Sequence, residues 1–155
     1  FKLNHPLAFY ASFFSIRAKA FDVGIMVGGL AKQLAEYERI KAIAKQSPME
    51  ENLFASLEVS MEMYKRGYEF IMVDIKESDA TRFRIVDGKL LPPFTSIAGL
   101  GETVAESIVR ERELRPFSSV NDVKRRCKVS QTILADMMEL GCFGELPEDE
   151  QMSLF

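Results

Sequence analysis

The sequence holds little of the chemistry that metal sites and disulfide frameworks require. Its 155 residues include two cysteines, one histidine and no tryptophan. Cys127 and Cys142 are too few and too far apart for a zinc site or a disulfide network, so we expect buried thiols in a reducing compartment. His5 has no second type of metal ligand near it. We therefore expect neither a metal nor a cofactor in this chain.

Long hydrophobic runs are also missing. No apolar stretch approaches the roughly 20 residues that a membrane-spanning helix needs. Residues 1–14 lack the order of charge, apolar stretch and small residues that marks a signal peptide. We expect a cytoplasmic protein with no membrane partner. Hydrophobic residues make up 47% and charged residues 28% of the chain, which suits one ordinary domain or two small ones.

The charges are unevenly distributed. The chain carries a net charge of −3, but seven basic residues oppose three acidic ones between Arg110 and Lys128. Residues 145–150 hold four acidic residues and no basic one. A basic stretch therefore precedes an acidic one, which points to a local anion-binding surface rather than a nucleic-acid-coating protein.

The first part of the chain has helical patterns. Asn4 is placed to cap a first helix, with Pro6 in its first turn and apolar residues round much of its circumference, which predicts burial. Apolar residues from 30 to 44 recur at helical spacing, as in a surface helix. Ser47-Pro48-Met49-Glu50 has a capping Ser, a Pro at the first helical position and a Glu at the third, which predicts a helix ending before Gly67.

A change of period follows. Residues 70–73 and 83–86 are short β-prone runs, and Asp87-Gly88 before residues 89–91 predicts a hairpin. Pro92-Pro93 ends this element. The predicted fold is mainly α with a small β hairpin. We place a helical part with the β element at 1–92, a second domain at 93–144 and a flexible acidic tail at 145–155.

The second domain opens with a glycine pattern that is typical of phosphate binding. In Gly99-Leu100-Gly101, Leu100 is expected to point into the core, while the two glycines let the backbone come close to another molecule. Gly101 then begins a helix, whose first N–H groups and positive dipole end favour a phosphate. Ala105 and Ile108 are expected on the buried side of this helix.

This segment, about 97–109, resembles a helix-hairpin-helix motif. A phosphate held by backbone amides carries no base information, so the resemblance implies duplex binding without sequence preference. One alternative is a glycine-rich turn that joins two helices and binds nothing. Another is a nucleotide-binding loop, but neither GxxxxGK[ST] nor GxGxxG is present.

Basic residues follow the glycine pattern and extend the candidate DNA surface. Arg110, Arg112 and Arg115 are placed to add phosphate contacts. A short helix after Pro116 ends in Arg125-Arg126, and Ser130 caps another that Gly141 closes. A merely solvated basic face at 124–128 is an equal alternative. The candidate DNA-binding residues are Gly99, Leu100, Gly101, Thr103, Arg110, Arg112, Lys124, Arg125 and Arg126.

The last residues suggest a docking peptide. Residues 144–150 are short, acidic and contain Pro147, as in a mobile tether. The chain then ends in apolar residues that have nothing of their own to bury them, which favours docking into a partner's pocket. A frayed end that folds back on the domain is the alternative. The candidate docking residues are Gln151, Met152, Ser153, Leu154 and Phe155.

Taken together, the ordered segments resemble the C-terminal region of PolC-type bacterial DNA polymerase III. The matching segments are KLNHPLAFYASFFSIRA, GYEFIMVDIKESDATRFRIVDGKLLPPF, IAGLGETVAESIVRERELRPFSSVNDVKRRCKVSQTILADMMELGCF and LPEDEQMSLF. The resemblance implies that residues 1 to about 90 belong to a fingers region and that the hairpin grips duplex DNA. It also implies that Gln151, Leu154 and Phe155 are the anchor residues by which the chain binds a sliding clamp.

The sequence departs from a complete polymerase in its carboxylates. Polymerisation uses clustered carboxylates that hold two metal ions about 3.5 to 4 Å apart. Asp74, Asp79 and Asp87 lie singly, so we expect catalytic residues, and the Mg²⁺ they bind, in another part of a longer chain. We expect no catalytic residue and no activity in this piece alone, which opens at Phe1 without a Met. A stand-alone helix-hairpin-helix DNA-binding or repair accessory protein is the alternative.

Overall fold

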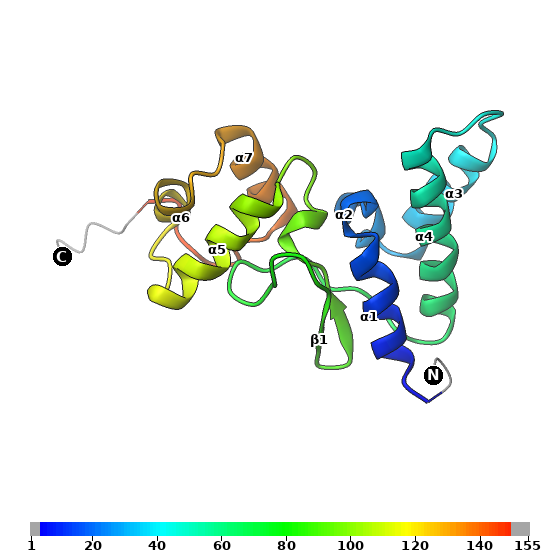
Figure 1. The fold of residues 1–155 in the computed structure, drawn as a ribbon, viewed down its shortest axis with the longest axis horizontal. Helices are drawn as coiled ribbons and strands as arrows, with labels where there is room; N and C mark the ends of the chain where they lie inside the picture. The colour runs from blue at the N-terminus through cyan, green and yellow to red at the C-terminus, as the bar shows by residue number, and fades with distance from the viewer. Residues whose placement is uncertain (1–3, 150–155) are drawn as a thin grey trace.

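The computed structural model describes residues 4–149. Figure 1 shows two lobes with a small β hairpin between them. The first lobe contains α1 (Pro6–Ile16), η1 (Ala18–Ala20), α2 (Val23–Met26), α3 (Leu30–Lys41) and α4 (Pro48–Lys65). The second contains η2 (Phe94–Ser96), α5 (Glu102–Leu114), α6 (Val120–Cys127) and α7 (Gln131–Leu140). The predicted fold class, mainly α with a small β hairpin, is confirmed.

Helix α4 begins with the predicted capping box. The Ser47 hydroxyl accepts a hydrogen bond from the Glu50 N–H at 3.2 Å, and the Glu50 carboxylate accepts one from the Ser47 N–H at 2.9 Å. Both unpaired N–H groups are thus satisfied by local side chains. Helix α4 ends before Gly67, whose φ of +91° suits glycine.

Helix α1 carries the aromatic core of the first lobe. Tyr10 and Phe14 are fully buried, but the other apolar residues of α1 are half-buried or exposed, so the predicted burial holds for one face of the helix only. The Phe14 ring packs edge-on against Phe21 and Phe70, with ring centroids 5.8 and 5.1 Å apart. The N-cap position is held by His5 rather than Asn4, because Pro6 is the first helical residue. The predicted Asn4 cap is therefore wrong by one residue.

The β element is smaller than its sequence suggested. Strands β1 (Arg84–Val86) and β2 (Lys89–Leu91) pair antiparallel, with Arg84 opposite Leu91. Asp87 and Gly88 turn the chain with φ of +51° and +76°, as a two-residue hairpin requires. Residues 70–73 form no strand and make only a bridge from Phe70 to Leu90. The prediction of a strand there is wrong, because its backbone pairs with β2 only near Leu90.

The connection between the lobes is held by backbone hydrogen bonds. The N–H groups of Phe94 and Thr95 donate to the carbonyls of Asp79 and Ala80 at 3.0 and 3.1 Å. These bonds cross the predicted domain boundary at residue 92, which stays a prediction. No helix within residues 4–149 combines the length and apolar character that crossing a membrane requires.

Two helices of the second lobe begin at serine caps, and α7 ends at the predicted Gly141. The Ser130 hydroxyl accepts from the Ile133 N–H at 3.3 Å and caps α7, and Gly141 closes this helix at φ +82°. Helix α6 is capped by Ser119, whose hydroxyl accepts from the Asp122 N–H at 2.9 Å. Both caps follow the usual preference for Ser at helix starts.

The acidic stretch lies against α6 as far as it is described. The N–H groups of Val120 and Asn121, at the start of α6, donate to the carbonyls of Pro147 and Glu148 at 2.8 and 3.0 Å. The first N–H groups of a helix have no partner inside it, so these carbonyls satisfy them. This part of the predicted tether is therefore attached to the domain.

Candidate nucleic-acid interface

The Gly99-Leu100-Gly101 hairpin has the predicted geometry. Gly99 has φ +82°, a left-handed conformation that residues with a Cβ rarely adopt. Leu100 is buried, and its N–H donates to the Ile97 carbonyl at 3.0 Å. Both glycines are exposed. The hairpin thus anchors itself through Leu100 and presents the backbone of its two glycines at the surface.

Helix α5 begins directly after the hairpin. Gly101 holds its N-cap position and has no side chain with which to cap the helix. Among residues 4–149, apart from Gly101 and its own chain neighbours, nothing lies within 4 Å of the place that a Cβ on Gly101 would take. Ala105 and Ile108 form the buried side of α5, as predicted. The first N–H groups of a 13-residue helix are therefore available to an anion at the surface.

Thr103 and Arg110 are exposed on α5. Thr103 lies in the first turn of the helix, close to the hairpin, and Arg110 lies two turns further along. Both are placed where a bound backbone starting at the hairpin can reach them along one helix. They remain predicted DNA contacts.

The Arg112 side chain is hydrogen-bonded within the fold. Its guanidinium donates to the backbone carbonyls of Ile75 and Ser78 at 3.1 and 2.9 Å, and it lies 5.9 Å from the centroid of the Phe94 ring. It therefore joins α5 to the segment that precedes the hairpin strands. Its position supports a structural role, and DNA contact by Arg112 stays a prediction.

A buried ion cluster fixes Arg126. The Arg126 side chain is 10% exposed and donates to Asp122 at 3.0 Å and to Glu111 at 3.3 Å. It also donates to the backbone carbonyls of Glu111 and Arg115 at 2.6 and 2.9 Å. Arg126 thus connects α6 to the end of α5, and its proposed contact with DNA is untested.

Asp122 is the centre of this cluster and is fully buried. Burial by itself raises the pKa of a carboxyl group, but hydrogen bonds from the Ser118 N–H and from Arg126 outweigh it and hold the pKa of Asp122 below its ordinary value. Arg125 also donates to Asp122 at 3.0 Å. Sequence reasoning missed Asp122, although its spacing of three and four residues from two arginines on one helix was a usable signal.

Lys124 and Arg125 lie at the surface of α6. Both residues are exposed, and the Lys124 ammonium donates to the Gln131 side chain at 2.7 Å. Arg125 has a side chain that is 62% exposed although it is held by Asp122. Both cations thus lie at the surface, each engaged by a side chain of the fold, and their contact with DNA stays a prediction.

Both cysteines are free and buried, and burial raises the pKa of Cys127 to about 11 and that of Cys142 to about 12. The described part of the chain holds no group of three His, Cys, Asp or Glu residues placed for a metal ion. The predicted docking residues 151–155 lie outside the described residues.

Comparison with known proteins agrees with this geometry. Residues 67–152 match the family model described as the helix-hairpin-helix motif. The chain belongs to the helix-hairpin-helix family. The match begins before the β hairpin, so the helix-hairpin-helix segment includes the residues that receive the Arg112 hydrogen bonds.

Relatives extend the similarity to the whole chain. The helix-hairpin-helix chain is 42% identical over 158 aligned residues to proteins named DNA polymerase III PolC-type from Streptococcus suis and Streptococcus pyogenes, and 40% identical to the one from Streptococcus mutans. The alignments cover 100% of this chain and 11% of each relative. The chain is thus homologous to a segment of PolC-type DNA polymerase III, and the resemblance inferred from the sequence is confirmed.

Proposed function

We propose that this chain binds the sugar-phosphate backbone of duplex DNA without sequence preference, as part of a replicative DNA polymerase. The observation that carries the proposal is the exposed hairpin at Gly99–Gly101, followed at once by the uncapped start of α5. Family membership supports it independently, because the matched motif spans this hairpin.

The chemistry of the hairpin favours phosphate over a base. Backbone N–H groups at a helix start present donors of fixed direction, and the helix dipole adds partial positive charge. Phosphates are the same at every nucleotide, so these contacts hold the duplex in place without reading its sequence. Exposed Arg110, Lys124 and Arg125 add longer-range attraction from the same lobe.

The proposal that this chain is part of a polymerase is supported by how much of the chain aligns with the PolC-type relatives. The similarity covers residues 1–66 as well as the matched motif, which a stand-alone helix-hairpin-helix accessory protein does not require. Within the longer chain, we expect this segment to grip the product duplex while other segments perform nucleotidyl transfer. The remainder of the polymerase chain is then its first partner.

The chain's own carboxylates do not suit a two-metal centre. The Asp74 side chain accepts a hydrogen bond from the Lys76 N–H at 2.7 Å and closes a local turn. Among residues 4–149, no three metal-ligating side chains are clustered. We expect the Mg²⁺ chemistry of a polymerase to belong to other residues of a longer chain, and we expect no primer extension by this chain alone.

A second contact is proposed for the last residues. Gln151, Leu154 and Phe155 provide a hydrogen-bonding group and two apolar anchors for a pocket on a β sliding clamp. A short link between duplex-binding and clamp-binding sites keeps each near its target once the other is bound. Such a link increases persistence on DNA without any new contact.

The proposed duplex binding is tested by fluorescence anisotropy with this chain and two labelled duplexes of equal length and unrelated sequence. We expect equal affinities within about twofold, because backbone contacts carry no base information. A preference of tenfold or more for one sequence contradicts backbone recognition, and so does an absence of binding at low salt by folded protein.

A further inference from the structure

A groove runs between the two lobes beside the hairpin. Its first cavity has a volume of about 520 Å³ and is lined by residues of α1, η1, α4, η2 and the start of α5. A second cavity of about 470 Å³ is lined by the hairpin itself. Both cavities are lined by Lys19, Thr95 and Glu102. The groove therefore continues from the hairpin onto the first lobe.

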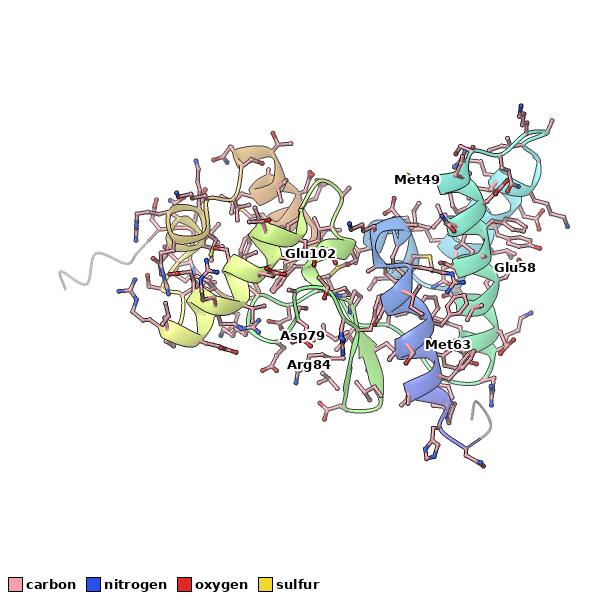
Figure 2. All side chains as sticks on the ribbon, viewed as in Figure 1. Met49, Glu58, Met63, Asp79, Arg84 and Glu102 are labelled. Carbon is pink, nitrogen blue, oxygen red and sulfur yellow. The ribbon has the colours of Figure 1, made fainter. Side chains whose placement is uncertain are left out.

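Figure 2 shows how the walls of this groove are placed. Glu102 lies at the beginning of α5, on the side of the second lobe that faces the first, and Met49 lies at the beginning of α4. Met49 lines the second cavity and is 67% exposed. A ligand in the groove thus touches both lobes and not the hairpin alone.

The lining of the first cavity has the composition of a phosphate-backbone site. Two cations, Arg17 and Lys19, lie among neutral hydrogen-bonding side chains, namely those of Ser15, Asn52, Thr81 and Thr95. Phosphate and sugar oxygens are contacted in DNA complexes by Arg and Lys and by Ser, Thr and Asn side chains. Lys19 is exposed, and the Arg17 guanidinium is held over the Phe13 ring at 4.0 Å from its centroid.

Thr95 supplies an independent sign of a ligand. The residue lines both cavities and is 8% exposed, but its hydroxyl is buried and has no hydrogen-bond partner within residues 4–149. An unpaired buried hydroxyl is costly, so such groups normally have a partner. Ser15, in the same wall, is already satisfied, because its hydroxyl donates to the Ala11 carbonyl and accepts from the Phe83 N–H.

We propose that this groove holds the backbone of one DNA strand, continuing from the phosphate bound at the start of α5. Lys19 and Arg17 pair with phosphate oxygens there, and the Thr95 hydroxyl donates to one of them. The inference rests on the proposed duplex binding and extends that site onto the first lobe. It assigns a role in DNA binding to η1, which lies outside the matched motif.

Glu102 places a negative charge in the groove. It is the one acidic residue among those that line the first cavity, and it is exposed in the first turn of α5. Asp22, in the second cavity, is engaged as the cap of α2 through the Ile25 N–H at 3.3 Å. A phosphate in the first cavity is attracted by two cations and repelled by Glu102, so Glu102→Gln is expected to tighten binding.

The test measures anisotropy of a labelled primed duplex with the 155-residue chain across a salt series. Loss of one phosphate contact lowers affinity about eightfold at 0.1 M salt and reduces the slope of log K against log salt by about 0.9. We expect both changes for Lys19→Gln. Lys45→Gln removes the same charge from an exposed site outside the groove and is expected to leave both quantities unchanged. Thr95→Val is expected to weaken binding about two- to tenfold with an unaltered slope, because a hydroxyl releases no counterion.

The outcomes separate the two proposals. If Lys19→Gln and Lys45→Gln bind alike while Gly101→Val binds more weakly, the groove has no part in DNA binding and the hairpin does. If the unmodified chain binds no duplex, the proposed function fails as a whole. If dATP at millimolar concentration displaces the duplex from the unmodified chain but not from Lys19→Gln, the groove is a nucleotide site and the strand proposal is wrong. Circular dichroism checks folding, and exposed Lys19 keeps the test valid should Thr95→Val unfold.

Discussion

Arg126 and Asp122 lie one turn apart on α6, and the guanidinium of Arg126 reaches from Asp122 to the end of α5. One nitrogen donates to the Asp122 carboxylate at 3.0 Å and another to the Glu111 backbone carbonyl at 2.6 Å. Asp122 is fully buried and Arg126 is nearly so. This pair therefore holds α6 against α5 and fixes the frame that carries the hairpin.

Asp122→Ala is expected to lower the free energy of unfolding by about 3 kcal/mol, because it removes one of the two carboxylates that pair with the nearly buried Arg126 charge. Urea unfolding followed by circular dichroism measures the change. Asp136→Ala, at an exposed position on α7, serves as the control and is expected to stay within about 0.5 kcal/mol. Equal effects of the two substitutions would show that the cluster adds nothing to stability.

The same carboxylate makes stability depend on pH. The pKa of Asp122 is held below its ordinary value in the folded chain, so the unfolded chain takes up a proton first as pH falls. The contribution of Asp122 to folding stability is present above its ordinary pKa of about 4. It is lost as pH falls through the lowered pKa of the folded chain. Asp122→Asn is expected to flatten the fall in melting temperature between about pH 5 and pH 2.5. An unchanged profile would contradict a charged, bonded Asp122.

Arg110 and Arg112 are expected to act differently although they are two residues apart. Arg110→Gln should weaken duplex binding about eightfold at 0.1 M salt without changing stability, because Arg110 is exposed and available to phosphate. Arg112→Gln should lower stability, because it removes donors from the Ile75 and Ser78 carbonyls. Anisotropy and urea unfolding on both variants measure the two quantities. Loss of stability in Arg110→Gln together with loss of duplex binding in Arg112→Gln would contradict these roles.

Phe155→Ala is expected to abolish binding to a purified sliding clamp and to leave duplex affinity unchanged, because the proposed sites are separate. Surface plasmon resonance with immobilised clamp gives the first quantity and anisotropy the second. Ser153→Ala, at a position that is not one of the three proposed anchors Gln151, Leu154 and Phe155, is the control and should bind the clamp normally. Parallel loss of clamp and duplex binding in Phe155→Ala would contradict separate sites.

Local chemistry made much of this structure predictable. Ser47 and Glu50 cap α4 through bonds between residues three apart, and Gly99-Leu100-Gly101 encodes its own turn, so a sequence pattern suffices for both. Contacts over long separations were not predictable. Arg112 looked like a surface cation until the fold brought it to Ile75 and Ser78, which lie more than 30 residues earlier.

The groove was hidden from the sequence for the same reason. Lys19 and Thr95 are 76 positions apart and meet only because η1 packs beside η2. Neither residue belongs to a recognisable motif, and an unpaired buried hydroxyl is a property of the fold. Sequence patterns thus predicted the hairpin part of the candidate site but not its extension.

The proposed phosphate contact lies against the backbone at the start of α5, where Gly101→Val would block it. Position 101 has φ −76° and open space around it, so a valine is accepted without strain but stands between the helix N–H groups and a phosphate. Gly24→Ala, in α2, is the control for an added side chain at a glycine with negative φ. We predict at least tenfold weaker duplex binding at 0.1 M salt for folded Gly101→Val and unchanged binding for Gly24→Ala. Unaltered affinity of Gly101→Val would remove the hairpin from the DNA site.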